Sequence, residues 1–283
     1  MGVTDCHVHI NPIWEMRPDA VRILAQIDPP PARFVSDPQE FLRYLDRAGV
    51  ERAVLINYVA PEVIGYTEAT NRFVSDYVRA DPERLIAVGG IRPDHPDPER
   101  EVEHLVRDLG IRALKLHPPH QLFRPNAYVD GELPGLRTLY EACSRRGLPI
   151  IFHTGTSVFP RARNRFADPM FVDDIAVDFP DLTIVLAHGG RPIWMESAMF
   201  LARRFPNVWL DISGTPPSRL LDYFPRLSRF SDKVLFGTDW PGPGVRDIGA
   251  NLEAFRALPL SADEQRRILE ENPLRVFPRR APS

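Results

Sequence analysis

The clearest chemical signal in the sequence lies close to the N-terminus, where two histidines are separated by one residue. His7 and His9 stand in a stretch whose valines, threonine and isoleucine favour a β-strand. Because alternate side chains of a strand share a face, we expect Asp5, His7 and His9 on one face and Cys6, Val8 and Ile10 on the other. Two imidazoles on one face can bind a single metal ion. Packed polar histidines also occur in this spacing, so the metal hypothesis depends on the rest of the chain.

Four further metal-capable side chains end later predicted strands: His117, His153, His188 and Asp239. In an α/β barrel the C-terminal ends of the strands meet at one rim, where the working residues lie. Five strands would therefore bring a metal-capable side chain to the same place. Burying so many histidines at one end as unrelated core residues is costly, because each needs its own hydrogen-bond partners. The pattern favours a shared metal site.

Eight units of a short apolar strand and a following helix account for the order of the chain. We expect strands at residues 3–10, 52–57, 85–91, 111–117, 149–153, 182–188, 208–212 and 233–237, and helices at 37–48, 66–80, 98–109, 133–146, 167–179, 193–204, 218–228, 248–257 and 262–271. This alternation predicts an α/β fold, a single (β/α)8 TIM barrel over residues 1–283. A doubly wound open sheet is the alternative, but it usually has fewer strands and a glycine-rich turn after the first.

Residues 11–36 interrupt this regular order. The segment is rich in proline, carries Trp14 and Phe34, and has a short helical patch around residues 20–26. We expect a long ordered loop or lid. Its two aromatic side chains, together with Trp240, either roof a pocket or anchor the loop.

The composition excludes several classes of protein. The 283 residues are 43% hydrophobic and carry a net charge of −3, which fits a globular protein and gives no electrostatic footprint for nucleic acid. Two cysteines provide no disulfide framework. No apolar run approaches the roughly 18 residues that span a membrane, and the first strand leaves no room for a signal peptide. We therefore expect a cytoplasmic protein whose partner is a small-molecule substrate.

Several motifs in combination resemble the amidohydrolase superfamily, and best its branch of small barrels related to aminocarboxymuconate-semialdehyde decarboxylase. The resemblance runs from about Val3 to Phe277 and rests on Asp5-x-His7-x-His9, Lys115-Leu-His117-Pro118, His153-Thr-Gly155, Ala187-His188-Gly189-Gly190, Phe236-Gly-Thr-Asp239-Trp-Pro241 and the terminal Glu271-Asn272-Pro273. It implies one divalent metal ion, zinc in the first place with iron or manganese as alternatives, held by His7, His9, His153 and Asp239. It also implies a homodimer.

The same resemblance implies a metal-dependent hydrolase. A metal-bound water would attack an ester, lactone or amide carbonyl of a small, carboxylate-bearing substrate. Asp239 would accept the proton of that water, and His188 would polarise the carbonyl or stabilise the oxyanion. The alternative is non-oxidative decarboxylation of an aromatic or unsaturated carboxylic acid, with His188 supplying a proton. A barrel that only binds a metal or ligand is a third hypothesis, which the complete ligand set disfavours.

Lys115 and His117 both face inward if their strand is regular. Some amidohydrolases carry a carboxylated lysine on this strand that bridges two metals. The alternative for Lys115 is an ammonium group that binds a substrate carboxylate, and we favour it because one metal is usual in the decarboxylase-like branch. His117 either binds substrate or caps the end of its strand.

Further candidates for the pocket wall follow these strands. Arg191 lies close to His188 in sequence and could hold a substrate carboxylate bidentately. The arginines at 161, 163 and 165 could do the same, but loop arginines are mostly solvated. Trp240 is a candidate for substrate contact, and His120 is a possible pocket residue.

Overall fold

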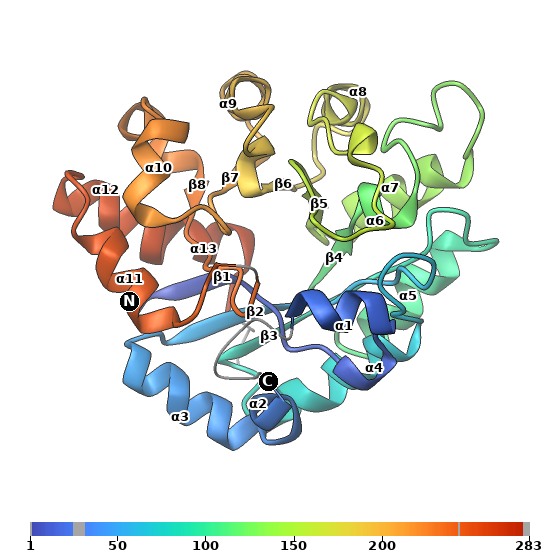
Figure 1. Ribbon diagram of the computed structural model, residues 1–283. Helices are drawn as coiled ribbons and strands as arrows, with labels where there is room; N and C mark the ends of the chain where they lie inside the picture. Colours follow the sequence, from blue (N-terminus) through green and yellow to red (C-terminus); the bar gives the residue numbers. More distant parts are fainter. Residues whose placement is uncertain (1, 25–31, 243, 280–283) are drawn as a thin grey trace.

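Eight parallel strands form one sheet at the centre of the molecule (Figure 1). The computed structural model describes residues 2–24, 32–242 and 244–279. In chain order the strands are β1 (Thr4–Val8), β2 (Arg52–Ile56), β3 (Leu85–Gly89), β4 (Ala113–Leu116), β5 (Ile150–His153), β6 (Ile184–Ala187), β7 (Val208–Asp211) and β8 (Val234–Leu235). Each strand pairs in parallel with the next one along the chain, as expected for strands joined by crossover helices.

The chain after β8 returns to β1 and closes the sheet. The backbone amide of Cys6 donates to the carbonyl of Phe236 at 2.9 Å, and that of His9 donates to the carbonyl of Trp240 at 2.7 Å. A parallel bridge joins Val8 to Trp240. The prediction of a (β/α)8 barrel is therefore confirmed, and the open doubly wound sheet is excluded.

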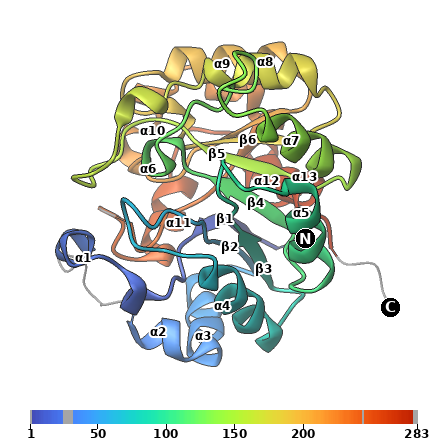
Figure 2. The same ribbon diagram turned by 90° about the vertical axis from the view of Figure 1, so that its right-hand side faces the viewer.

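Helices surround the strands on the outer side of the barrel (Figures 1 and 2). Helix α3 (Pro38–Ala48) begins and ends at clear sequence signals: it follows Asp37, whose side chain accepts two backbone hydrogen bonds, and ends at Gly49 with a φ of 71°. The others around the barrel are α4 (Ala69–Tyr77), α5 (Pro98–Arg107), α7 (Gly135–Arg145), α8 (Phe171–Asp178), α9 (Met195–Arg204), α10 (Pro217–Tyr223), α11 (Ile248–Arg256), α12 (Ala262–Arg266) and α13 (Asn272–Val276). Within the described residues, no helix is long and apolar enough to cross a bilayer.

The loop predicted for residues 11–36 contains more helix than expected. It holds the short 3-10 helix η1 (Ile13–Glu15) and the helices α1 (Pro18–Leu24) and α2 (Ala32–Ser36). The predicted helical patch at 20–26 thus corresponds to α1, and its last two residues lie outside the described residues. The loop after β4 likewise contains α6 (Pro118–Gln121). Both segments follow the C-terminal ends of strands, where the predicted site lies.

Two apolar layers hold the barrel together. Between strands and helices, outward-facing residues such as Leu55 and Phe152 are fully buried. Inside the barrel, a smaller cluster of inward-facing residues that includes Val54 is closed at the N-terminal end by Phe277. The carbonyl of Phe277 accepts a hydrogen bond of 2.8 Å from Nη2 of the buried Arg52. We call this inward-facing cluster, closed by Phe277, the apolar plug. It does not reach the C-terminal end of the barrel, where polar groups lie.

Strand β1 departs from the alternation predicted for it. Its register against β2 shifts after Asp5, which indicates a bulge. Cys6 packs with the inward-facing cluster, and Asp5 accepts hydrogen bonds from the backbone nitrogen and Oγ1 of Thr238 at 2.9 and 2.7 Å. The predicted faces are therefore wrong for Asp5 and Cys6, because a bulge breaks the two-residue period of the strand. Val8 and Ile10 pack in the outer apolar layer, on the face opposite the histidines as predicted.

We expect Phe277→Ala to destabilise the barrel by about 3–5 kcal/mol, because it empties the apolar plug of a side chain that is 2% exposed. Urea unfolding followed by circular dichroism measures the free energy of unfolding. Phe200→Ala is the matched control: Phe200 is 50% exposed on α9, and its loss should change stability by about 0.5 kcal/mol or less. Equal losses in the two variants would show that the plug does not stabilise the barrel.

Candidate active site

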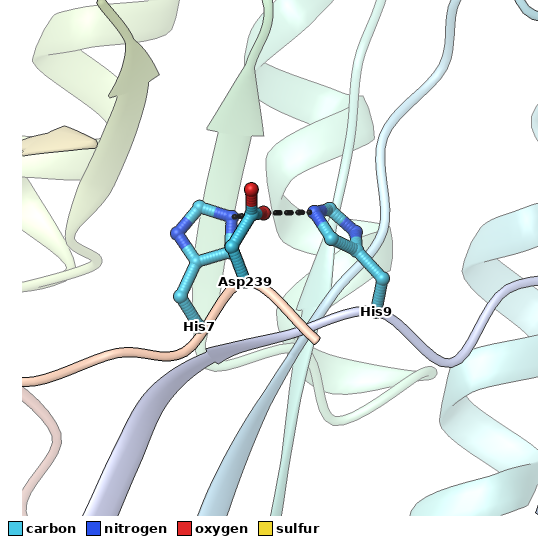
Figure 3. Close-up of side chains that lie close together, drawn as sticks. All are labelled: His7, His9 and Asp239. Carbon is cyan, nitrogen blue, oxygen red and sulfur yellow. Dashed lines mark ion pairs between the residues drawn. The ribbon is translucent and has the colours of Figure 1, made fainter. Parts of the chain in front are cut away.

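Three side chains converge at the C-terminal end of the barrel (Figure 3). His7 and His9 lie at the end of β1, and Asp239 follows β8. The Oδ1 atom of Asp239 lies 3.5 Å from Nε2 of His7 and 3.2 Å from Nε2 of His9. One potential ligand atom of each residue lies within 4.8 Å of the other two. This spacing suits one metal ion bound by two imidazoles and a carboxylate.

The opposite nitrogens of both imidazoles already have partners. Nδ1 of His7 lies 2.6 Å from Oδ2 of Asp211, and Nδ1 of His9 lies 3.1 Å from the carbonyl oxygen of Ile56. A carboxylate and a carbonyl only accept hydrogen bonds, so each Nδ1 carries the proton. Burial lowers the pKa of His7 well below its usual value, which keeps this ring neutral. Its Nε2 atom is therefore left with a lone pair, the arrangement of a metal-binding histidine.

The unpartnered atoms of this group fit a divalent metal ion. Nε2 of His7 is buried and has no hydrogen-bond partner among the described residues. It faces a carboxylate oxygen of Asp239, which also offers only lone pairs. A cation between these atoms would satisfy Nε2 of His7 and the oxygen of Asp239 at the same time. Imidazole nitrogen and carboxylate oxygen together suit zinc, iron or manganese.

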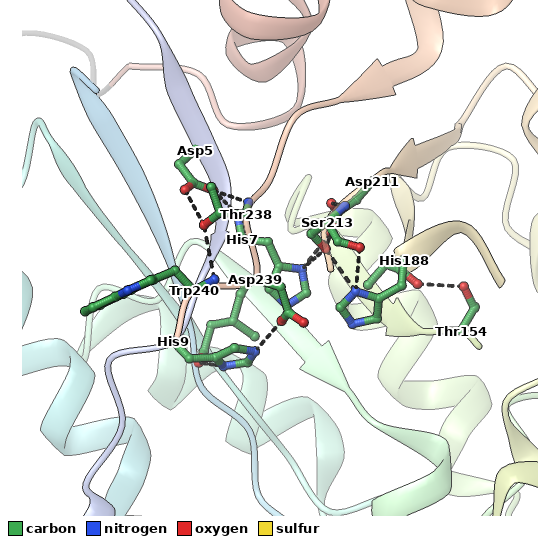
Figure 4. Close-up of polar contacts among 12 residues, drawn as sticks. Asp5, His7, His9, Thr154, His188, Asp211, Ser213, Thr238, Asp239 and Trp240 are labelled. Carbon is green, nitrogen blue, oxygen red and sulfur yellow. Dashed lines mark hydrogen bonds and ion pairs between the residues drawn. The ribbon is translucent and has the colours of Figure 1, made fainter. Parts of the chain in front are cut away.

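Ser213 joins His7 to His188 (Figure 4). Its hydroxyl lies 3.1 Å from Nδ1 of His7 and 3.0 Å from Nδ1 of His188, and it donates to Oδ2 of Asp211 at 3.0 Å. The carbonyl of Ser213 lies 3.2 Å from the same nitrogen of His188, so this nitrogen carries the proton. Burial, and then the neighbouring imidazoles of His153 and His7, lower the pKa of His188 well below its usual value. His188 therefore offers the lone pair of Nε2.

Two buried carboxylates support the site, and sequence reasoning gave neither of them this role. Burial raises the pKa of Asp211 to about 6 and that of Asp5 to about 7. Asp211 fixes His7, whereas Asp5 holds Thr238, the residue before Asp239. A signal for Asp211 was available, because it is the penultimate residue of the predicted strand at residues 208–212. Nothing in the sequence indicated that Asp5 would turn toward Thr238.

The backbone adopts uncommon conformations at the site. His188 and Asp239 have positive φ values of 64° and 67°. Such conformations are unfavourable for residues other than glycine, and they cluster at active sites. Gly214, with a φ of 64°, passes so close that a Cβ atom would lie 2.2 Å from Nη2 of Arg191 and 2.8 Å from Oδ2 of Asp239. Glycine is therefore needed at this position.

Two cationic side chains face the same space. Lys115 is 1% exposed, and its Nζ has no hydrogen-bond partner among the described residues. Burial lowers the pKa of Lys115 to about 8, although Asp211 and Asp239 oppose the shift. Nη2 of Arg191 lies 3.7 Å from Oδ2 of Asp239. Both predicted anion-binding residues therefore line the cavity, and the ammonium group of Lys115 has no hydrogen-bond partner in the part of the chain that the structure describes.

Three further histidines form a stack beside this group. The ring of His117 lies between those of His153, at 3.8 Å, and His120, at 3.5 Å, and is nearly parallel to both. His153, the fourth predicted ligand, lies outside the group of three potential ligands. Its Nε2 is buried without a hydrogen-bond partner among the described residues, and so is Nδ1 of His117. The unpartnered Nδ1 of His117 makes no capping bond, and the ring lines the cavity described below.

Trp240 lies away from the cavity. It is fully buried, with its ring 5.4 Å from that of Phe34 and 6.0 Å from that of Phe41. Trp14 is 67% exposed and packs on Phe73. We expected these aromatic residues either to roof a pocket or to anchor the loop. Their contacts in the structure are of the anchoring kind. Trp240 does not line the cavity, so we expect it to support Asp239 through the backbone rather than to touch substrate.

A cavity of about 230 Å³ opens on these groups, a size suited to a small molecule. The exposed arginines at 161, 163 and 165 do not line it, and Arg161 instead pairs with Asp19 at 3.2 Å. Part of the wall is apolar and includes Ile13 and Met16. The polar part includes neutral residues such as Tyr58 and Ser157, and titratable ones: His9, Lys115, His117, His120, His153, His188, Arg191 and Asp239.

Comparison with known proteins agrees with the motifs. The amidohydrolase family model matches residues 4–279. A 2-pyrone-4,6-dicarboxylate hydrolase from Comamonas testosteroni is 30% identical over 142 residues, which cover 36% of this chain and 46% of the relative. A gamma-resorcylate decarboxylase from Rhodococcus jostii is 23% identical, covering 83% of this chain and 86% of the relative. Among solved structures, an uncharacterised TIM-barrel protein from Bordetella bronchiseptica is 26% identical with a TM-score of 0.76, covering 98% of each chain.

We expect Asp211→Asn to weaken metal binding about 10- to 100-fold, because the Nδ1–H of His7 loses its ionised acceptor. Competition with a chromophoric chelator measures the affinity for zinc or manganese. Asp222→Asn is the control, since Asp222 is exposed and pairs only with Arg219 on α10. If both variants bind metal as the parent protein does, Asp211 does not set the metal affinity.

Proposed function

This chain belongs to the amidohydrolase family and is an enzyme, and we propose that it is a metal-dependent hydrolase. It would act on an ester, lactone or amide carbonyl of a small, carboxylate-bearing substrate. The observation that carries the proposal is that Nε2 of His7, Nε2 of His9 and Oδ1 of Asp239 converge on one point. The tautomers of both histidines are fixed by the hydrogen bonds of their Nδ1 atoms.

The proposed ligands of one divalent ion are His7, His9, His153 and Asp239. Zinc is the first candidate, with iron or manganese as alternatives, because three imidazoles and a carboxylate suit all three. When bound, such an ion acts as a Lewis acid that lowers the pKa of water and polarises a carbonyl group. His153 enters this set because its buried, unpartnered Nε2 faces the same cavity.

Asp239 is suited to accept a proton. Burial opposes its ionisation, but the neighbouring His9 and His7 and the cation of Arg191 hold its pKa below the usual value. It is therefore a carboxylate at neutral pH, able to take the proton of the attacking water and return it to the leaving oxygen or nitrogen. Oδ1 of Asp239 approaches the histidines, whereas Oδ2 faces Arg191.

Hydrolysis fits the protonation state of His188 better than decarboxylation does. Decarboxylation of an aromatic or unsaturated acid needs a group that delivers a proton to carbon. His188 is neutral, and its Nδ1 proton bonds the carbonyl of Ser213. Its Nε2 atom can therefore accept a hydrogen bond from the attacking water, but it has no proton with which to polarise a carbonyl or stabilise an oxyanion, the role that the resemblance implied. Decarboxylation remains the second candidate, because the match to the decarboxylase relative covers 83% of this chain.

Lys115 and Arg191 are the proposed binding groups for the substrate carboxylate. Both present cationic nitrogen atoms to the cavity, and Nζ of Lys115 has no competing hydrogen bond among the described residues. A charge-assisted bond to such a nitrogen is stronger than one between neutral groups. A small carboxylate with a hydrolysable carbonyl is therefore the class of substrate to test, with hydrolysis and release of carbon dioxide followed side by side.

His188→Ala should retain one equivalent of metal per chain and lose turnover at least about 100-fold, because it removes a group beside the reacting carbonyl and not a ligand. Elemental analysis of protein purified without chelator and a turnover assay measure the two effects. His7→Ala is the contrasting variant and should lose the metal. Loss of metal from His188→Ala would make His188 a ligand, and a parent protein that neither contains nor takes up metal would refute the proposed mechanism.

Lys115→Met should leave the metal content unchanged at one equivalent and raise KM for a carboxylate substrate about 10- to 100-fold, because a charge-assisted hydrogen bond is lost. The chain contains one other lysine, Lys233, which packs on Trp209. Lys233→Met should therefore change neither quantity. A fall from two equivalents of metal to one in Lys115→Met would instead indicate a carboxylated lysine that bridges two ions.

A further inference from the structure

The wall of the cavity contains a second polar cluster, made of residues that the proposed reaction does not use. Tyr58 follows β2, His120 lies in α6 and Ser157 follows β5, and all three line the cavity. The hydroxyl of Tyr58 lies 3.0 Å from Nδ1 of His120, and Nε2 of His120 lies 2.7 Å from Oγ of Ser157. Both ring nitrogens of the histidine are therefore bonded to hydroxyl groups. We call these three residues the hydroxyl–imidazole chain.

The hydroxyl–imidazole chain is held in place from several sides. The ring of His120 stacks on that of His117 at 3.5 Å and meets the edge of Phe159 at 5.2 Å. The backbone nitrogen of Ser157 donates to Oδ1 of Asn164 at 2.8 Å, and its carbonyl accepts from Nδ2 of Asn164 at 3.2 Å. Groups fixed in this way bind a ligand without a large ordering cost.

No member of the hydroxyl–imidazole chain is charged at neutral pH. His120 is 1% exposed, and neither of its hydrogen-bond partners is a carboxylate. Burial lowers the pKa of His120 to about 3, and burial also raises the pKa of Tyr58. The cavity therefore has a neutral hydrogen-bonding wall in addition to its cationic groups, Lys115 and Arg191.

The number of exchangeable protons in the hydroxyl–imidazole chain determines which ligand groups it can bind. A neutral imidazole donates through one nitrogen and accepts through the other. If Tyr58 donates to Nδ1 of His120, then Nε2 donates to Ser157 and the hydroxyl proton of Ser157 is free. With the other tautomer, the free hydroxyl proton belongs to Tyr58. Oγ of Ser157 also accepts from the backbone nitrogen of Phe159 at 3.2 Å. In either tautomer the hydroxyl–imidazole chain therefore offers one free hydroxyl proton, and the oxygen of Tyr58 keeps a lone pair that can accept.

One donor and one acceptor match an uncharged oxygen function. A carboxylate needs several donors and no acceptor beside it, and the cavity supplies such donors at Lys115 and Arg191. A hydroxyl group can both donate and accept, and a carbonyl can accept from the free hydroxyl. The side chains of Met16 and Tyr66 pack beside Tyr58, so an apolar carbon frame would carry this oxygen.

We propose that Tyr58, His120 and Ser157 form a subsite for a neutral hydroxyl or carbonyl oxygen of the ligand. The subsite deepens the proposed function, on which it rests only in assigning that oxygen to the substrate. The substrate class is then a small carboxylate with a second, uncharged oxygen substituent on an apolar or unsaturated frame. The carboxylate is bound by the cationic groups, and the second oxygen by the hydroxyl–imidazole chain.

Binding of phenol and of toluene to the purified full-length protein tests the subsite directly, because neither probe has a carboxylate or a bond to hydrolyse. Ligand-observed NMR titration measures both dissociation constants. Tyr58→Phe and Ser157→Ala should each weaken phenol binding about tenfold, the effect of one lost hydrogen bond, and change toluene binding less than about twofold.

Tyr66→Phe is the matched control, because Tyr66 also lines the cavity and its ring lies 6.0 Å from that of Tyr58, outside the chain. It should leave phenol binding unchanged. No saturable phenol binding to the parent protein, equal phenol affinity in the parent and both chain variants, or a loss in Tyr66→Phe alone would overturn the subsite. Failure of the proposed hydrolase is a separate result, seen as absent metal or absent turnover while phenol discrimination persists.

Discussion

Asp211 holds Nδ1 of His7 at 2.6 Å in a part of the barrel where both side chains are out of contact with water. Burying a carboxylate is costly unless hydrogen bonds compensate it, and here His7 together with the amide and hydroxyl of Ser213 provides them. The same bond keeps the proton of His7 away from Asp239. Ser213 extends the arrangement to His188, so one buried carboxylate orders His7, Ser213 and His188, the last of which lines the cavity.

The barrel is the frame that makes this arrangement possible. Asp211 ends β7, His7 lies one residue before the end of β1, and Asp239 follows β8, so closure of the sheet between its first and last strands brings them together. The bulge in β1 turns Asp5 toward Thr238, and the left-handed backbone at Asp239 carries its carboxylate back over the strand ends. Local strain of this kind persists where the surrounding contacts fix it. The apolar plug at the opposite end supplies that rigidity.

The cavity divides its polar groups by charge. Lys115, Arg191 and the Asp239 group form a strongly electrostatic part, and the hydroxyl–imidazole chain forms a neutral part. A low-dielectric interior strengthens both kinds of contact, but it penalises a ligand that places a charge against the wrong part. Discrimination among small carboxylates would therefore come from where their uncharged oxygen atoms lie, as well as from the reacting bond.

The sequence by itself determined the barrel, because hydrophobic periodicity and helix signals are local and repeat eight times. It also placed His7, His9, His188 and Asp239 at one rim, since the ends of parallel strands must meet there. Only the tertiary structure decided the partners of these residues. The roles of Asp211 and His120, the burial of Trp240 and the turn of Asp5 depend on a bulge, on side-chain packing and on contacts between residues far apart in the chain. None of these follows from spacing along one strand, because each is settled by what the neighbouring strands and loops bring to the same place.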